Sequence, residues 1–398
     1  MTLSACDACL RRTDLVVAVA GSIDIAWRER RGRTARVLAL PDEELLALDP
    51  SAAARYERFD PGRARRRIAG AGLVAVCGCE PGYPDRLREL PDPPAVLHVA
   101  GSLAALPAGE AVAIVGARRA TPYGLEVSRA LGRGLAAAGL PVVSGMALGI
   151  DSAAHLGALE PLSASAPAER PSPAAHPALD ERPALALADA PSAVAAAADG
   201  PAAAAPIAVL AGGAETPYPA RMRGLHRRLI EAGAVVSEMP PGFGGHRWCF
   251  PARNRIIAAL STITIVVEAA TKSGSLITAD LATDLGRIVA AVPGPVISRY
   301  SAGANELLHA GAAVIRGPRD VLDLALGPDA PLPPEPQPLP PLDPTQRRLL
   351  DAIERGRGTL AELAGTMDEA RAASRALSEL ELLGLVRREF GGRYVRRS

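Results

Sequence analysis

Short apolar runs alternate with longer amphipathic stretches between residues 111 and 320 of the chain. The runs are rich in Val, Ile and Ala and contain few polar residues, which is typical of strands buried on both faces of a sheet. The stretches between them have the apolar spacing of helices. Strands that alternate with helices predict an α/β fold built on a doubly wound parallel sheet.

Several of the expected elements have clear local signals. The apolar segment Val112–Val115 predicts a short buried strand. Thr121 followed by Pro122 predicts a helix start, because threonine caps free N–H groups and proline fits the first turn. This helix is expected to continue to about Ala138, and a later one is expected from about residue 220 to residue 232.

Three strand–helix junctions in this region contain small residues where the helix is expected to begin. They lie in the segments 142–155, 250–261 and 266–279, in which a buried-looking run stops at Gly, Ser or Asn. Free backbone N–H groups at a helix start, together with the helix dipole, favour an anion. The junctions therefore predict a phosphate-binding edge.

The regions outside this pattern differ in composition. One internal stretch is built mainly of Ala, Pro, Ser and Asp without a periodic apolar face, which predicts a disordered surface insertion. A later proline-rich stretch predicts a semi-rigid linker, and the helical and hairpin patterns after it predict a winged helix. The expected organisation is a helical module at 1–75, a Rossmann-like sheet domain at 80–326 interrupted at 160–205, a linker at 327–344 and a winged helix at 345–398.

The composition limits the classes of protein that need to be considered. With 398 residues, 48% of them hydrophobic, the chain can bury the cores of two or three domains. Its net charge is only +1, so any nucleic-acid surface has to be a local patch. No apolar run reaches the ~18 residues of a membrane helix, and no signal pattern opens the chain. We expect a cytoplasmic protein without a membrane contact.

The five cysteines do not suggest a disulfide scaffold in a chain of this length. Cys6 and Cys9 form C-x-x-C, and Cys77 and Cys79 form C-x-C much further along. Four thiolates can build a tetrahedral zinc site, which would join the N-terminal module to the sheet domain. C-x-C is a poorer spacing for metal ligands than C-x-x-C. The alternative is therefore that the four cysteines are unrelated small core residues.

Catalytic patterns are scarce. A dinucleotide enzyme needs G-x-G-x-x-G at the first strand–helix turn, but this turn reads GARR and ends at Arg119. The histidines form no metal-ligand or Cys/His pattern, and no serine stands in G-x-S-x-G. We therefore predict a protein that is not an enzyme, in which Arg118 and Arg119 bind phosphate through their forked donors.

Aromatic rings are interleaved with arginines between Phe243 and Arg255, without a single acidic residue. Single-stranded nucleic acid needs this combination, because basic groups follow its backbone and ring faces stack on its bases. The alternative is a loop whose rings cover the core and whose arginines face water. The expected contacts in this segment are Arg247, Trp248, Phe250, Arg253 and Arg255, and a second basic cluster contains Arg221 and Arg223.

Six segments, taken in order, resemble the DprA family (DNA-processing protein A, also called Smf): GARRATPYG, SGMALGIDSAAH, YPARMRGL, FPARNRIIAALS, VVEAATKSGSLITA and AVPG. The match covers roughly residues 83–326, and the C-terminal segment resembles the winged helix that many members carry. The resemblance implies an extended Rossmann domain, a homodimer and no catalysis; we expect no cofactor apart from the structural zinc considered above. It also implies single-stranded DNA binding that protects incoming DNA and loads the RecA recombinase in natural transformation.

The resemblance also implies site residues. It matches the first-loop arginines, the glycine loop, the FPxRNR segment and the SGS turn of the family. Two departures exist: Ala220 replaces the usual basic residue after YP, so that Arg221 or Arg223 would supply the charge, and the insertion follows Glu160. The implied DNA contacts are Arg118, Arg119, Gly145, Gly149, Asp151, Phe250, Arg253, Asn254, Arg255, Lys272, Ser273, Gly274 and Ser275.

The last part of the sheet domain, about residues 305–315, has more apolar residues than a final edge element needs. We expect the dimer interface there, at Leu307, Leu308, Val314 and Ile315; the alternative is that these side chains complete the core. Two other functions remain open. A nucleotide-binding sensor would suit the SGS turn, and a phosphoribohydrolase-like enzyme would use a related fold, although its PGGxGTxxE motif is replaced here by SGSLITA.

Overall fold

The computed structural model describes residues 5–29, 35–164, 202–328, 342–354, 357–383, 385–388 and 392–396. The chain divides into two compact units, residues 1–333 and residues 334–398. Most of the expected insertion and most of the expected linker lie outside the described residues. No helix in the described ranges is both long and apolar enough to cross a bilayer.

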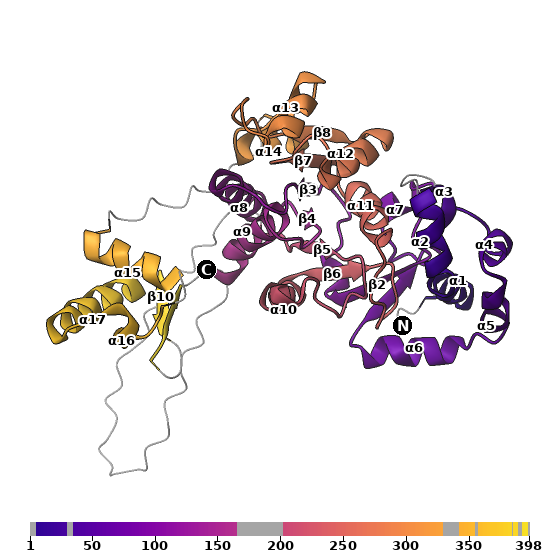
Figure 1. Ribbon diagram of the computed structural model, residues 1–398, viewed down its shortest axis with the longest axis horizontal. Helices are drawn as coiled ribbons and strands as arrows, with labels where there is room; N and C mark the ends of the chain where they lie inside the picture. Colours follow the sequence, from indigo (N-terminus) through magenta and orange to yellow (C-terminus); the bar gives the residue numbers. More distant parts are fainter. Residues whose placement is uncertain are drawn as a thin grey trace, which may run out of the picture. The chain divides into compact units, whose positions relative to one another are not determined.

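A nine-stranded sheet forms the centre of the first unit, in the order β1-β2-β6-β5-β4-β3-β7-β8-β9 (Figure 1). The strands from β6 to β9 in this order are parallel to their neighbours, which confirms the predicted doubly wound sheet. β2, whose apolar run predicts a strand, pairs antiparallel with both β1 and β6, a pairing that the sequence pattern did not predict. The strands are Val74–Cys77 (β1), Val96–Gly101 (β2), Val112–Val115 (β3), Val142–Ser144 (β4), Ile207–Val209 (β5), Ala234–Ser237 (β6), Ile263–Val266 (β7), Ile288–Ala291 (β8) and Ala313–Val314 (β9).

Helices cover both faces of the sheet because the strand residues alternate between two cores. Val112 and Ile114 of β3 belong to one core, and Ala113 and Val115 belong to the other. The first face carries α8 (Pro122–Ala137), α9 (Ile150–Ala164), α10 (Arg223–Ala232) and α14 (Pro318–Leu326). The second carries α7 (Asp85–Arg88), α11 (Cys249–Leu260), α12 (Gly274–Asp284) and α13 (Ala302–His309).

The N-terminal helices gather at the end of the sheet that carries β1 and β2 (Figure 1). Leu15 and Ile23 share a core with Trp248 and Cys249 at the start of α11, so the expected helical module packs directly on the sheet domain. The helices are α1 (Asp7–Ala18), α2 (Ala20–Glu29), α3 (Ala35–Leu38), α4 (Asp42–Leu48), α5 (Ala53–Glu57) and α6 (Pro61–Gly70), and short 3-10 helices lie at Pro50–Ala52, Leu103–Ala105 and Ala220–Met222.

Two predicted boundaries can be compared with the structure. Thr121 caps α8 as expected, since its Oγ1 accepts the N–H of Gly124 at 3.2 Å. Residues 160–164, at the start of the expected insertion, belong to α9, which continues to residue 164. On the other side, the N–H of Ala204 donates to the carbonyl of Ala136 at 2.8 Å.

The second unit contains three helices followed by two antiparallel strands, in the predicted order. Leu349, Leu377 and Leu380 are buried in its hydrophobic core. The elements are α15 (Pro344–Glu354), α16 (Leu360–Leu363), α17 (Met367–Leu382), β10 (Val386–Arg388) and β11 (Tyr394–Arg396).

Candidate nucleic-acid interface

A cleft of about 940 Å³ opens beyond the ends of β3 and β7. β3 lies between β4 and β7, so connections leave this point of the sheet in opposite directions. Ligands of doubly wound sheets bind at such a switch point, outside the carboxyl ends of the strands. The cleft is lined by the segments that follow β3 and β7, by the start of α11, and by Trp27 and Tyr300.

Exposed basic side chains stand along this cleft. Arg118 and Arg119 follow β3, and Lys272 follows β7. The guanidinium carbon of Arg118 lies 5.4 Å from the centroid of the Phe250 ring. A guanidinium at this distance from an aromatic ring is stabilised by the ring quadrupole. The pair therefore places a fixed positive charge beside a half-buried ring.

The SGS turn forms the opposite wall. Ser273 caps α12, and its Oγ accepts the N–H of Ser275 at 3.4 Å. The Nδ2 of Asn254 donates to the carbonyl of Gly274 at 3.3 Å and fixes the turn against α11. No atom lies within 4 Å of the position that a β-carbon of Gly274 would take. The backbone at this helix start is thus open to a ligand, next to Lys272.

The glycine loop supports the wall of the cleft that carries the arginines. Gly149 has φ +83°, and a β-carbon there would lie 2.2 Å from the carbonyl oxygen of Ala117. Asp151 is buried and accepts the N–H groups of Gly145 at 3.2 Å and Ala147 at 3.4 Å. Burial raises the pKa of the Asp151 carboxyl. These residues hold the loop in place, and a carboxylate is not a phosphate contact.

Arg253 lies at the floor of the cleft and is nearly buried. Its Nη1 donates to the carbonyls of Gly145 at 2.7 Å and Val209 at 2.6 Å. Burial lowers the pKa of Arg253 to about 10, so the side chain remains charged at neutral pH. Its positive charge contributes to the potential in the cleft, whereas its hydrogen bonds connect α11 to the loop after β4 and to the end of β5.

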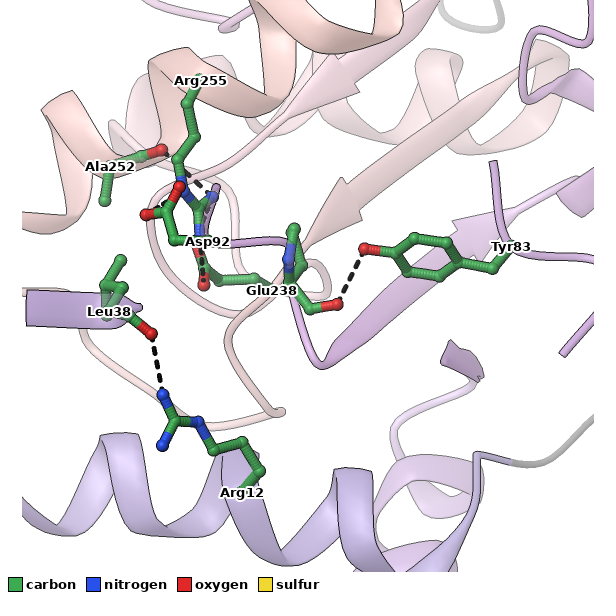
Figure 2. A network of polar contacts seen from close by, with 8 residues as sticks. Arg12, Leu38, Tyr83, Asp92, Glu238, Ala252 and Arg255 are labelled. Atoms are coloured by element: carbon green, nitrogen blue, oxygen red, sulfur yellow. Dashed lines mark hydrogen bonds and ion pairs between the residues drawn. The ribbon is translucent and has the colours of Figure 1, made fainter. Parts of the chain in front are cut away.

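Arg255 does not line the cleft and belongs to a buried ion-pair network (Figure 2). Its guanidinium pairs with Asp92 at 2.9 Å and with Glu238 at 2.9 Å. Burial raises the pKa of both carboxyls. Since Arg255 is 3% exposed, the expected DNA contact has to be corrected to a structural position.

Trp248 also has to be removed from the expected contacts. It is completely buried among the N-terminal helices, and its Nε1 donates to the carbonyl of Ala20 at 3.1 Å. No ring face is left on which a base can stack. Arg247 is exposed but does not line the cleft.

Sequence reasoning missed three aromatic rings at or near the cleft, those of Trp27, Tyr218 and Tyr300. Trp27 of α2 lines the cleft, and its buried Nε1 has no hydrogen-bond partner in the described part of the chain. The chain contains only two tryptophans, and this rarity was the available signal that Trp27 has a special role. Tyr218 is 56% exposed, and its ring centroid lies 5.5 Å from that of Phe250. Exposed Arg221 and Arg223 follow it closely in the sequence.

The residues expected at a dimer interface occupy different environments. Val314, in the edge strand β9, is 53% exposed, whereas Ile315 is fully buried in a core. Leu307 and Leu308 of α13 are half-buried against the other core. Ile315 therefore completes the fold, and the remaining three are the ones that a partner can reach.

The fold and the cleft define a Rossmann-type α/β protein with a basic, aromatic-lined switch point. The sequence profile of DNA recombination-mediator protein A matches residues 75–166 and 192–325, and the chain belongs to this family.

Relatives and a solved structure agree with this assignment. DprA of Mycobacterium tuberculosis is 36% identical over 263 residues, which cover 65% of this chain but only 57% of the relative. DprA of Bacillus subtilis is 33% identical over 268 residues, which cover 67% of this chain and 76% of the relative. The X-ray structure of DprA from Streptococcus pneumoniae superposes with a TM-score of 0.56 at 26% identity, covering 79% of this chain and 95% of that one.

Proposed function

We propose that this protein binds single-stranded DNA in the cleft beyond β3 and β7 and acts as a recombination mediator without catalysis. The observation that carries the proposal is the Arg118 guanidinium 5.4 Å from the Phe250 ring, at a basic switch point. Single strands expose both phosphates and base faces, whereas a duplex hides its base faces. Membership of the recombination-mediator family supports the same function.

The proposed contacts form three groups. Phosphates meet Arg118, Arg119 and Lys272 and the backbone of Gly274 at the SGS turn, where the helix dipole favours an anion. Bases stack on Phe250, Trp27 and Tyr300. The DNA strand leaves the cleft past Tyr218 toward Arg221 and Arg223. Arg247, three residues before Phe250 in the sequence, adds a further positive charge.

We propose further that the protein works in the cytoplasm as a homodimer, protects incoming DNA in natural transformation and delivers it to the RecA recombinase. The family resemblance is the support for these finer roles. For the dimer, the exposed edge strand β9 with Val314, beside Leu307 and Leu308, offers an apolar surface at the end of the sheet.

Binding of labelled single-stranded and double-stranded oligonucleotides at two salt concentrations tests the function. The variant Arg118→Ala/Arg119→Ala should weaken single-strand binding and reduce the salt slope by ~0.7 for each phosphate that the protein no longer neutralises. The matched control is Arg66→Ala/Arg316→Ala, which removes two exposed charges of the first unit that do not line the cleft.

Equal affinity for both forms of DNA would overturn the proposal. A protein that binds a free mononucleotide with little salt dependence, and oligonucleotides no better, would instead be a nucleotide sensor.

A further inference from the structure

The four cysteines noted in the sequence come together at the junction of the N-terminal module and the sheet. Cys6 is the N-cap of α1 and Cys9 lies in its first turn. Cys77 ends β1, and Cys79 follows in the next turn. The four Sγ atoms all lie within 4.8 Å of one another, and no other group of this kind occurs in the ranges that the structure describes.

The spacing of the sulfur atoms suits a single metal ion. The Sγ of Cys79 lies 3.8 Å from that of Cys9 and 3.9 Å from that of Cys6. A tetrahedral zinc ion with Zn–S bonds of ~2.3 Å places its sulfur ligands about 3.8 Å apart. A disulfide would require about 2.05 Å. An iron–sulfur cluster distributes four thiolates over two irons in [2Fe–2S] or four irons in [4Fe–4S], which spreads the set of sulfurs further apart than one ion does.

Neighbouring groups hold the cysteine-bearing segments in place. The N–H of Cys6 donates to the Sγ of Cys77 at 3.4 Å. Arg88 holds the turn that carries Cys79, because its guanidinium donates to the carbonyls of Gly78 at 3.2 Å and Glu80 at 2.7 Å. Hydrogen bonds and charges of this kind orient the ligands of metal sites and tune their affinity.

We infer that Cys6, Cys9, Cys77 and Cys79 bind one zinc ion, which fastens α1 to the turn after β1. The ion closes a loop from the start of the chain to the edge strand of the sheet. Because α2 follows α1 directly and carries Trp27, the same site fixes one wall of the cleft. The inference does not depend on what the cleft binds.

Cys249 provides the internal control. It is the fifth cysteine, buried at the start of α11 and outside the cluster. Burial raises the pKa of its thiol to about 12. Its Sγ accepts the N–H of His246 at 3.3 Å, a bond that a serine hydroxyl can replace.

Elemental analysis of the full chain, purified without a metal-affinity step, tests the inference. We expect one zinc per chain, and a Co²⁺-substituted protein with the thiolate charge-transfer absorption of a tetrahedral site. Cys6→Ser/Cys9→Ser and the exposed Cys79→Ser should each lower zinc affinity by about tenfold or more. Cys249→Ser should still bind one zinc ion per chain.

Two results would overturn the inference. One is a folded wild-type protein that takes up no zinc on titration while its four thiols react freely with a thiol reagent. The other is a mass that shows these cysteines paired as disulfides in protein purified under reducing conditions.

Discussion

The Nη1 of Arg253 lies 2.7 Å from the carbonyl oxygen of Gly145, and it occupies the space that a side chain at residue 145 would need. A β-carbon at Gly145 would lie 1.9 Å from this nitrogen. The arginine of α11 thus reaches the loop after β4 only because that loop has glycine at this position. The two residues together determine the shape of the cleft floor.

Gly145→Ala should destabilise the protein, because the new methyl group displaces a buried, hydrogen-bonded guanidinium. We expect a loss of about 1–3 kcal/mol in the free energy of unfolding, as for other overpacked sites, measured by urea denaturation. Gly274→Ala is the control, since no atom lies within 4 Å of its β-carbon position. A Gly145→Ala variant as stable as Gly274→Ala would contradict this account.

Arg255→Ala should be strongly destabilising because it leaves Asp92 and Glu238 buried without their cation. Removal of one partner from a buried ion pair costs about 3–5 kcal/mol. The exposed pair Arg66–Asp60 is the comparison, and Arg66→Ala should change stability by less than about 1 kcal/mol. Urea denaturation measures the free energy of unfolding of both variants. Similar small losses would mean that the network is not needed for stability.

Stability should fall as the pH is lowered through the weakly acidic range. Burial lowers the pKa of His98 to about 4 and of His155 to about 3. Between about pH 6.5 and these values only the unfolded chain binds the protons, so unfolding is favoured by up to about 1.4 kcal/mol per pH unit for each histidine. Urea denaturation at a series of pH values measures this slope.

Substitution assigns that slope to particular residues. His98→Gln should reduce the slope, and the exposed His309→Gln should leave it unchanged. The buried carboxyls whose pKa is raised contribute a slope of opposite sign, so the difference between variants is the test: a slope unchanged by His98→Gln would exclude the effect.

Phe250→Ala should weaken single-strand binding by about 1–3 kcal/mol for each base that stacks on the ring. Phe250→Tyr keeps the ring face and should retain most of the affinity. Fluorescence anisotropy with a labelled oligonucleotide measures both variants. Equal weakening by alanine and tyrosine would show that the ring acts through packing and not through stacking.

Removal of residues 334–398 should cost little single-strand affinity. The second unit has its own core, and α17 carries Arg371 and Arg375 against Asp368, Glu369, Glu379 and Glu381. This balance is unfavourable for a helix that approaches phosphates. Loss of binding in a truncated protein that still unfolds cooperatively would place the site in the second unit.

The sequence predicted the elements whose signals are local. Thr121 and Pro122 mark the start of α8, and the Ser273 turn marks the start of α12, because capping depends on residues a few positions apart. The antiparallel extension through β1 and β2 was not predictable in this way. Which strands become neighbours depends on pairing across the sheet, and an apolar run does not encode its partner.

The main error of the sequence-based prediction concerned the arginines of the FPxRNR segment, which were all expected to contact DNA. Neighbouring helix residues point about 100° apart, so Asn254 faces the cleft while Arg255 turns inward. The partner that makes this burial tolerable is Asp92, on a distant part of the chain. A buried charge cannot be recognised from sequence when its counter-ion is that remote.

The pairing of Val112 with Ile263 has a consequence for the growing chain. Both strands, and the lining residues from Trp27 to Tyr300, have to leave the ribosome before the cleft can exist. Contacts between such distant segments slow folding, although closure entropy grows only slowly with loop length. A nascent chain that stops before β7 therefore lacks the wall with Lys272, and the capacity to hold a strand arises late in synthesis.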